Sequence, residues 1–313
     1  MQADLTQLAT LAGMTRLVDD AAAQRESVLE GVSNVTPPIT FKGRGGYKPD
    51  FLTGWNLPLP LATGPTATDM RRLRRGGTGV VLKYGHFSSV MSISRKMPML
   101  TAVNIDGSKS KSLPRVKTWN YDGRLDEADQ WGEELYSGNA LDRGHMVRRE
   151  DPVWGTLAEA SMANVDTFHY TNACPQMAGM NQKTWVGLEN YVLSNARADG
   201  MRVSVYTGPF FTTDDLAYRG ALIPRAFWKV VAIVLPNGRP SVTAYKIDQN
   251  KELRELEFVY AGYKTYQISI QQVINGTHID FSALTPFDGF SQHEAATGTI
   301  LAEAIDDLSQ IRV

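Results

Sequence analysis

The chain has 313 residues, of which 42% are hydrophobic and 21% are charged, as in an ordinary globular protein. Its 32 Lys and Arg residues are balanced by 33 Asp and Glu residues, so the formal net charge of -1 excludes a polycation that binds nucleic acid through bulk charge. The single cysteine, Cys174, excludes an intramolecular disulfide and a cysteine-rich zinc site.

Residues 1–36 predict a helical N-terminal extension. Leucines recur at roughly helical spacing, at Leu5, Leu8 and Leu11, and the segment is acidic. Such an amphipathic segment packs on the main domain or on a partner subunit, or else it forms an autoinhibitory cap. The segment lacks the basic and continuous apolar regions of a signal peptide. We therefore expect a protein that is cytoplasmic, or exported without a classical signal peptide.

Residues 37–70 predict a connector. The segment is rich in Pro and Gly, which oppose long helices and central strands. We expect its large apolar residues to pin it to a surface; these are Tyr47, Phe51, Leu52 and Trp55.

The remaining chain predicts an α+β fold with a mainly antiparallel sheet, because strands and helices do not alternate regularly. Short β-rich runs lie at 79–84, 87–94, 100–105, 203–207, 226–235, 241–247 and 263–270. Helical patterns lie at 155–164, 181–198 and 292–310. We expect a main domain over 71–290 and a helical tail over 291–313. No run approaches the ~18 apolar residues of a membrane helix, so we expect no membrane partner.

Basic residues are concentrated between residues 71 and 117. The stretch 71–105 contains no Asp or Glu, and a second basic run follows at 109–117. Four arginines lie together at Arg71, Arg72, Arg74 and Arg75. The run predicts either a solvated basic face or a surface that binds a polyanion.

The sequence DRGH at 142–145 is the strongest local candidate for catalysis. Gly144 lets the backbone turn sharply before His145, and Arg148 and Arg149 follow closely. A neutral imidazole can accept a proton from water, and neighbouring arginines can hold an anionic substrate. The pattern therefore favours proton-transfer chemistry on an anionic substrate.

A second candidate follows at residues 171–189. TNACPQ (171–176) precedes Asn181 and the helical pattern that carries Glu189. An amide oxygen and a carboxylate on one side of a helix suit a hard cation such as Mg²⁺. Asn is also a common helix N-cap, so Asn181 alone could serve only to begin the helix.

DRGH, then TNxxPQ, then NQxxWxxLE resemble the DNA/RNA non-specific endonucleases, the ββα-metal or His-Me finger nucleases that include endonuclease G and a secreted bacterial nuclease. The similarity extends to TGPFF (207–211) and IPRAFWKVV (223–231) and covers about residues 80 to 285. It implies an α+β fold with a central, mainly antiparallel sheet flanked by helices, and it makes 71–290 the nuclease domain.

The resemblance also implies roles for six residues. His145 is the general base that deprotonates the attacking water. Asn181 is the direct protein ligand of Mg²⁺, or of Mn²⁺, and Glu189 orients water bound to that ion. The other three are Arg95, which stabilises the transition state, Asn172, which positions the site by a hydrogen bond at or near His145, and Arg143, which lies near the phosphate.

One position departs from the family pattern. Leu193 stands where the secreted bacterial relative has an arginine, which puts one phosphate contact in doubt. Arg197, one turn later, is the nearest replacement on the same helical pattern.

Together these implications predict a metal-dependent endonuclease that hydrolyses DNA and RNA to 5′-phosphate and 3′-hydroxyl ends. Contacts to backbone phosphates carry no sequence information, which accounts for the lack of specificity. The alternative is a nucleic-acid-binding protein whose nuclease activity is latent or lost. An unspecific nuclease endangers its own cell, so we expect a restrained toxin or defence effector, controlled by an inhibitor or by a protease that removes residues 1–70. A homodimer is a further partner that the resemblance allows.

Overall fold

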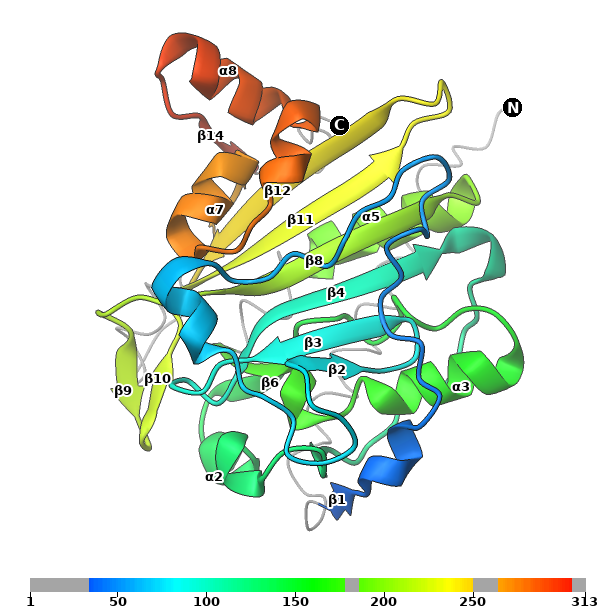
Figure 1. Cartoon of the computed structure of the whole chain (residues 1–313), viewed down its shortest axis with the longest axis vertical. Helices are drawn as coiled ribbons and strands as arrows, with labels where there is room; N and C mark the ends of the chain where they lie inside the picture. The colour runs from blue at the N-terminus through cyan, green and yellow to red at the C-terminus, as the bar shows by residue number, and fades with distance from the viewer. Residues whose placement is uncertain (1–33, 178–185, 250–263, 306–313) are drawn as a thin grey trace, which may run out of the picture.

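The computed structural model describes residues 34–177, 186–249 and 264–305 (Figure 1). Its strands are β1 (Asn34–Thr36), β2 (Val81–Lys83), β3 (Phe87–Met91), β4 (Pro98–Asp106), β5 (Asn120–Asp122), β6 (Leu141–His145), β7 (Ala173–Met177), β8 (Arg202–Phe210), β9 (Leu216–Tyr218), β10 (Ala221–Ile223), β11 (Ala226–Val234), β12 (Pro240–Asp248), β13 (Lys264–Ile268) and β14 (Ala302–Ile305). Its α-helices are α2 (Glu133–Tyr136), α3 (Leu157–Asp166), α5 (Val186–Ala198), α7 (Ile270–Thr277) and α8 (Gly289–Thr297). Its 3₁₀ helices are η2 (Pro38–Phe41), η3 (Gly64–Asp69), η4 (Gly107–Lys109), η5 (Glu127–Asp129), η6 (Tyr170–Asn172) and η8 (Ser282–Phe287).

One large antiparallel sheet organises the chain. Eight strands lie in the order β14-β13-β12-β11-β8-β4-β3-β2. Strands such as β11, with the sequence AFWKVVAIV, are apolar at nearly every position. Because successive side chains point to opposite faces, a strand of this kind needs cover on both faces. The expected large, mainly antiparallel sheet of a mixed helix and strand protein is confirmed.

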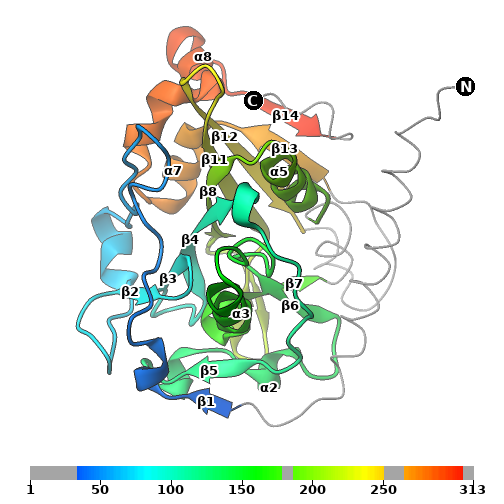
Figure 2. The same cartoon turned by 90° about the vertical axis from the view of Figure 1, so that its right-hand side faces the viewer.

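Both faces of the sheet are covered, as Figure 2 shows. On the hairpin face, the β6–β7 hairpin and α5 lie over a core that includes Phe87 and Phe227. On the opposite strap face, α7, η8 and most of residues 37–70, which we call the strap, lie over a core that includes Trp228 and Val230. Phe41, near the start of the strap, belongs instead to the core of the hairpin face. Neighbouring residues of β11 thus serve two separate cores.

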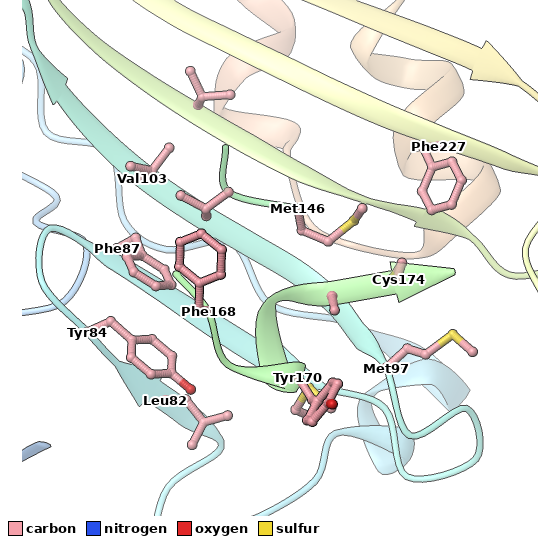
Figure 3. Packing of buried hydrophobic residues seen from close by; sticks show 14 of the residues in the cluster. Leu82, Tyr84, Phe87, Met97, Val103, Met146, Phe168, Tyr170, Cys174 and Phe227 are labelled. Carbon is pink, nitrogen blue, oxygen red and sulfur yellow. The ribbon is translucent and has the colours of Figure 1, made fainter. Parts of the chain in front are cut away.

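The core of the hairpin face includes the residues just before and within β7. Figure 3 shows Phe168, Tyr170 and Cys174 gathered with Phe87 of β3 and with Met97, which directly precedes β4. Cys174 is fully buried, and burial raises the pKa of its thiol well above the usual value. Its role is therefore that of a small apolar residue, because a protonated, buried thiol is not a nucleophile.

The strap is packed against the sheet by aromatic residues. The hydroxyl groups of Tyr47 and Tyr206 lie 2.6 Å apart in a buried hydrogen bond. Phe51 and Leu52 are buried, and Trp55 packs against the same core. The expectation that these side chains of the strap pin it to a surface is confirmed.

Two expectations about the ends of the chain are corrected. The helix expected over 292–310 ends at Thr297, because Gly298 takes a left-handed conformation (φ 70°). Strand β14 follows and pairs with β13, so the tail 291–313 is not helical throughout. At the other end, Asn34–Thr36 form a strand parallel to β5 rather than helix. The remainder of the expected extension 1–36, residues 1–33, lies outside the described residues, and the domain boundaries stay a prediction.

In the described ranges, no helix has the length and apolar character needed to cross a membrane.

Candidate active site

The β6–β7 hairpin places His145. In the antiparallel register Gly144 lies opposite Cys174, and His145, the last residue of β6, lies opposite Ala173. A Cβ atom at position 144 would lie 2.1 Å from Cδ of Gln176. A larger residue would force the buried side chain of Gln176 to move, so close packing in the hairpin favours the glycine of DRGH.

Asn172 holds the backbone that follows His145. Its Oδ1 accepts from the N–H of Val147 at 2.8 Å, and its Nδ2 donates to the carbonyl of Val147 at 3.0 Å. The N–H of Met146 donates to the backbone carbonyl of Asn172 at 2.9 Å. The side chain also donates to the carbonyl of Thr167. A fully buried amide thus fixes the two residues after His145, as a neighbouring strand would do.

His145 lies among aromatic rings and is neutral. Its ring centroid lies 4.7 Å from that of Trp119 and 4.9 Å from that of Phe168. Burial, followed by the positive charges of Arg115 and Arg149, lowers the pKa of His145 well below 6.5. Its buried Nε2 has no hydrogen-bond partner in the described part of the chain. A neutral imidazole with an unused nitrogen can accept a proton.

Arg115 is a functional candidate that the sequence analysis did not assign, whereas Arg149 was named there as a neighbour of His145 that can hold an anion. The guanidinium of Arg115 lies 5.1 Å from the centroid of the Phe168 ring, which also contacts His145. Arg149 donates to the carbonyl of Leu113 at 2.9 Å and pairs with Glu150 Oε1 at 2.7 Å. The signal for Arg115 was the basic run 109–117, which gave no reason to prefer one of its members.

A second charged group lies beside the segment that follows His145. Glu189, in the first turn of α5, is 7% exposed, and Lys229 of β11 is 2% exposed. Lys229 Nζ lies 3.2 Å from Glu189 Oε1. Arg148, three residues after His145, donates to the backbone carbonyl of Glu189 at 3.4 Å. The tertiary fold therefore brings α5, β11 and residues 145–151 together.

Asp151 belongs to the same group. Burial raises the pKa of its carboxyl to about 7, while Arg148 and Lys229 act in the opposite direction and Glu189 adds to the rise. A carboxyl that is half-protonated near neutral pH is unusual outside functional sites. No sequence signal singled out Asp151 or Lys229, because neither belongs to a pattern that spacing alone can interpret.

The structure does not bring Arg95 to His145. Its guanidinium donates to Asp215 Oδ2 at 2.8 Å and to the carbonyl of Thr212 at 2.7 Å, and it lies over the ring of Phe211. These contacts commit Arg95 to the segment after β8, so the transition-state role implied for it lacks support from this placement.

Two other expected phosphate contacts are also engaged elsewhere. Arg143 forms an ion pair with Glu133 of α2 and lies over the ring of Tyr136. Arg197, the candidate replacement at the Leu193 position, donates to Ser110 Oγ at 2.8 Å and pairs with Glu150 at 3.2 Å. Leu193 itself is buried in the core of the hairpin face.

The basic stretch 71–75 is partly neutralised. Arg71 pairs with Asp129, and Arg74 and Arg75 pair with Asp126. These arginines and their acidic partners form surface or half-buried ion pairs. The stretch is therefore less positive than its sequence suggests.

Asn181, the implied metal ligand, lies outside the described residues. Glu189 offers a buried carboxylate whose Oε1 accepts no hydrogen bond within the described chain. The described residues contain no group of three or more His, Cys, Asp or Glu side chains that could hold a metal ion. The carboxylate of Glu189 and the side-chain amide of an asparagine such as Asn181 are hard oxygen donors. Donors of this kind fit Mg²⁺ with water as its other ligands.

The chain matches the family model for the DNA/RNA non-specific endonucleases over residues 68–288. It is 37% identical over 302 residues to the uncharacterized protein y4fB of Sinorhizobium fredii, covering 88% of this chain and 44% of that protein. It is 32% identical over 150 residues to a nuclease of Serratia marcescens, covering 44% of this chain and 52% of that protein. The chain thus spans about half or less of the length of these relatives.

A solved structure of an EndoG/EndoGI complex contains a similar fold. The TM-score is 0.51 at 16% identity, and the match covers 66% of this chain and 86% of that chain. At this identity the likeness concerns the fold alone.

Proposed function

Because the chain belongs to the DNA/RNA non-specific endonuclease family, we propose that it hydrolyses phosphodiester bonds of DNA and RNA without sequence preference, leaving 5′-phosphate and 3′-hydroxyl ends. One observation carries the proposal. His145 is neutral, its buried Nε2 has no partner among the described residues, and arginines lie close by.

In this proposal His145 is the general base. Its lowered pKa keeps the imidazole neutral at physiological pH, so Nε2 can take a proton from the attacking water. Asn172 positions His145 by fixing the backbone of Val147. The two-stranded hairpin followed by α5 is the part of the chain that we assign to the ββα-metal unit.

Arg115 and Arg149 are the arginines that we assign to the phosphate, in place of Arg95. Both act on the pKa of His145, so their charges reach the reacting centre. A phosphodiester gains negative charge as it is attacked, and fixed positive charges stabilise that change. Arg143 lies two residues before His145 and therefore on the same face of β6, where it could contact a neighbouring phosphate.

The proposed cofactor is Mg²⁺, with Mn²⁺ as the alternative. Asn181 would hold the ion, and the carboxylate of Glu189 would orient water by hydrogen bonding. A bound divalent cation would offset charge on the scissile phosphate and on the leaving 3′ oxygen. A neutral amide ligand leaves most of the cation's charge available to the substrate.

A cleavage assay tests this proposal. Supercoiled plasmid, linear duplex and single-stranded RNA are incubated with Mg²⁺ or with EDTA. We expect cleavage of all three that requires metal, and a loss of about 10²- to 10⁴-fold in His145→Ala. The matched control is His293→Ala, which removes an exposed imidazole from α8. Unchanged turnover in His145→Ala would show that His145 is not the base.

Restraint of the activity, as in a toxin or defence effector, is the remaining part of the proposal. The residues around Arg74 and Arg75 are exposed, as cleavage by a protease requires. The strap, however, is packed into the strap face, so loss of residues 1–70 would remove part of a core. We therefore propose that restraint, if it lies in the chain, resides in residues 1–33. An inhibitor protein and a homodimer are tested by co-purification and by light scattering.

A further inference from the structure

Lys229 is a lysine buried in the hairpin face of the sheet. It is 2% exposed, and it lies on β11 between Trp228 and Val230, whose side chains point to the strap face. Burying an ammonium group is strongly unfavourable unless it is paired and hydrogen-bonded. A purely structural β11 would place an apolar residue at this position, as it does at its neighbours Phe227 and Val231.

The contacts of Lys229 join the sheet to α5. Its Nζ donates to Thr207 Oγ1 at 2.9 Å, and Thr207 lies directly opposite Lys229 in the β8–β11 register. The same Nζ lies 3.2 Å from Glu189 Oε1. The ammonium is thus held by the sheet on one side and reaches the helix on the other.

The ion pair engages one oxygen of the Glu189 carboxylate. Oε1 lies within ion-pair distance of Lys229, yet it accepts no hydrogen bond from any described residue. Lys229 therefore fixes the place of Oε1 through one contact, and a carboxylate oxygen can accept from a second donor. Arg148 adds a contact from the segment after His145 to the backbone of Glu189, so the pair lies where the two halves of the site meet.

We propose that Lys229 is a positioning residue for hydrolysis, whose ammonium fixes the carboxylate of Glu189 on α5 relative to His145. The inference rests on the function proposed above, because it gives Lys229 its effect through Glu189. It predicts that the charge, rather than the volume, of residue 229 determines turnover.

The experiment compares Lys229→Met, which keeps the length and removes the charge, with Lys229→Arg, which keeps the charge. We expect kcat on plasmid DNA to fall at least about tenfold in Lys229→Met, with KM changed less than about threefold, and to recover in part in Lys229→Arg. The matched control is Lys246→Met, on the adjacent strand and the opposite face. The control should keep kcat within about twofold of the wild type.

A second readout uses the protein without metal or substrate. In EDTA, Lys229→Met should lower the Tm, because it leaves a buried carboxylate without its partner. Glu189→Gln combined with Lys229→Met should restore at least half of that loss, since the pair is then removed as a whole. Its kcat should equal that of Glu189→Gln alone within about twofold.

The outcomes separate this inference from the proposed function. If Lys229→Met lowers the Tm but keeps the kcat of the wild type, the lysine is structural and the inference is wrong. Additive losses of kcat in the double variant would also overturn it. If Glu189→Gln alone keeps full activity while His145→Ala is inactive, the role proposed for Glu189 fails, and the inference fails with it. If His145→Ala is fully active, the proposed base is wrong whatever Lys229 does.

Discussion

The two faces of the sheet bury different chemistry. The hairpin face contains an ion pair between Lys229 and Glu189, a carboxyl of raised pKa in Asp151 and a neutral His145. The strap face is closed chiefly by apolar side chains, and its buried tyrosine pair, Tyr47 with Tyr206, is uncharged. One sheet thus separates a layer that contains buried titratable groups from a layer that is mainly apolar.

The difference separates stability from function. Buried charges contribute little to stability when they are compared with apolar residues of the same size. On the strap side, the buried carboxylate of Asp288 serves the backbone, because it accepts from the N–H groups that begin α7 and α8. The cluster of buried titratable groups on the hairpin face indicates another use, since such groups concentrate at functional sites. We therefore expect changes on the strap face to act on folding and changes on the hairpin face to act on turnover.

The largest expected effect comes from removing the strap. A chain of residues 71–313 loses Tyr47, Phe51 and Leu52 from the core of the strap face. Burial of each such side chain stabilises the folded state by about 1.5–3 kcal/mol, whereas the free energy of unfolding of a whole domain is only about 5–15 kcal/mol. We expect no cooperative unfolding transition by circular dichroism, whereas a chain of residues 34–313 unfolds cooperatively. A folded and more active 71–313 would restore the idea that the strap is an inhibitory segment.

Asn172→Ala should lower both the stability of the protein and its turnover. It leaves the buried N–H and carbonyl groups of Val147 without their partner. We expect a loss of about 2–3 kcal/mol in the free energy of unfolding, and a fall of kcat of about 100-fold. Urea denaturation and plasmid cleavage measure the two effects. A variant that loses stability but keeps kcat would show that Asn172 does not position His145.

Leu52→Ala is the matching change on the strap face. Leu52 is 3% exposed, and its truncation leaves a cavity in the core there. The free energy of unfolding should fall by about 2–4 kcal/mol. The kcat of the folded protein at 25 °C should stay within about twofold of the wild type. A large loss of kcat would break the proposed separation of the two faces.

The smallest expected effect is a shift in pH dependence. The charge of Arg115 lowers the pKa of His145, so Arg115→Ala should raise that pKa towards 6.5. The base must be neutral, and the acidic limb of kcat/KM should therefore move up by ~0.5–1 pH unit. Arg72→Ala, an exposed arginine with a hydrogen bond to Thr78, serves as the control. An unmoved limb would mean that His145 does not determine the pH profile.

The same pKa affects stability with a defined sign. The pKa of His145 is lower in the folded than in the unfolded state, so the unfolded chain binds more protons below about pH 6.5. The folded state should therefore lose stability as the pH falls below that value. In His145→Ala this contribution should be absent.

Much of the sheet could be predicted from sequence. The runs at 87–94 and 226–235 contain β3 and β11, and the run at 241–247 covers all of β12 except its two end residues. These strands could be predicted because long apolar and β-branched stretches mark buried strands. The hairpin at His145 could not be predicted in this way. LDRGH and ACPQM are short and have no clear alternation, and they pair only because the fold places them side by side.

The candidate site, like the sheet, could be predicted from the sequence only in part. Motif spacing pointed to His145, Asn172 and Glu189, and the structure gathers these three near the hairpin face. Spacing also pointed to Arg95, which Asp215 holds elsewhere. Arg115, Asp151 and Lys229 entered the site only through tertiary contacts, because their sequence neighbourhoods resemble those of ordinary charged residues.

The sequence by itself determined the family, the antiparallel sheet and the identity of the candidate base, because these depend on residue types in a fixed order. Only the tertiary structure decided the electrostatics. The pKa of His145 depends on its burial and on Arg115, 30 positions away in sequence, and the partner of Glu189 lies 40 positions further along the chain. Charges act through space at short range, and distance in space is a property that chain order does not specify.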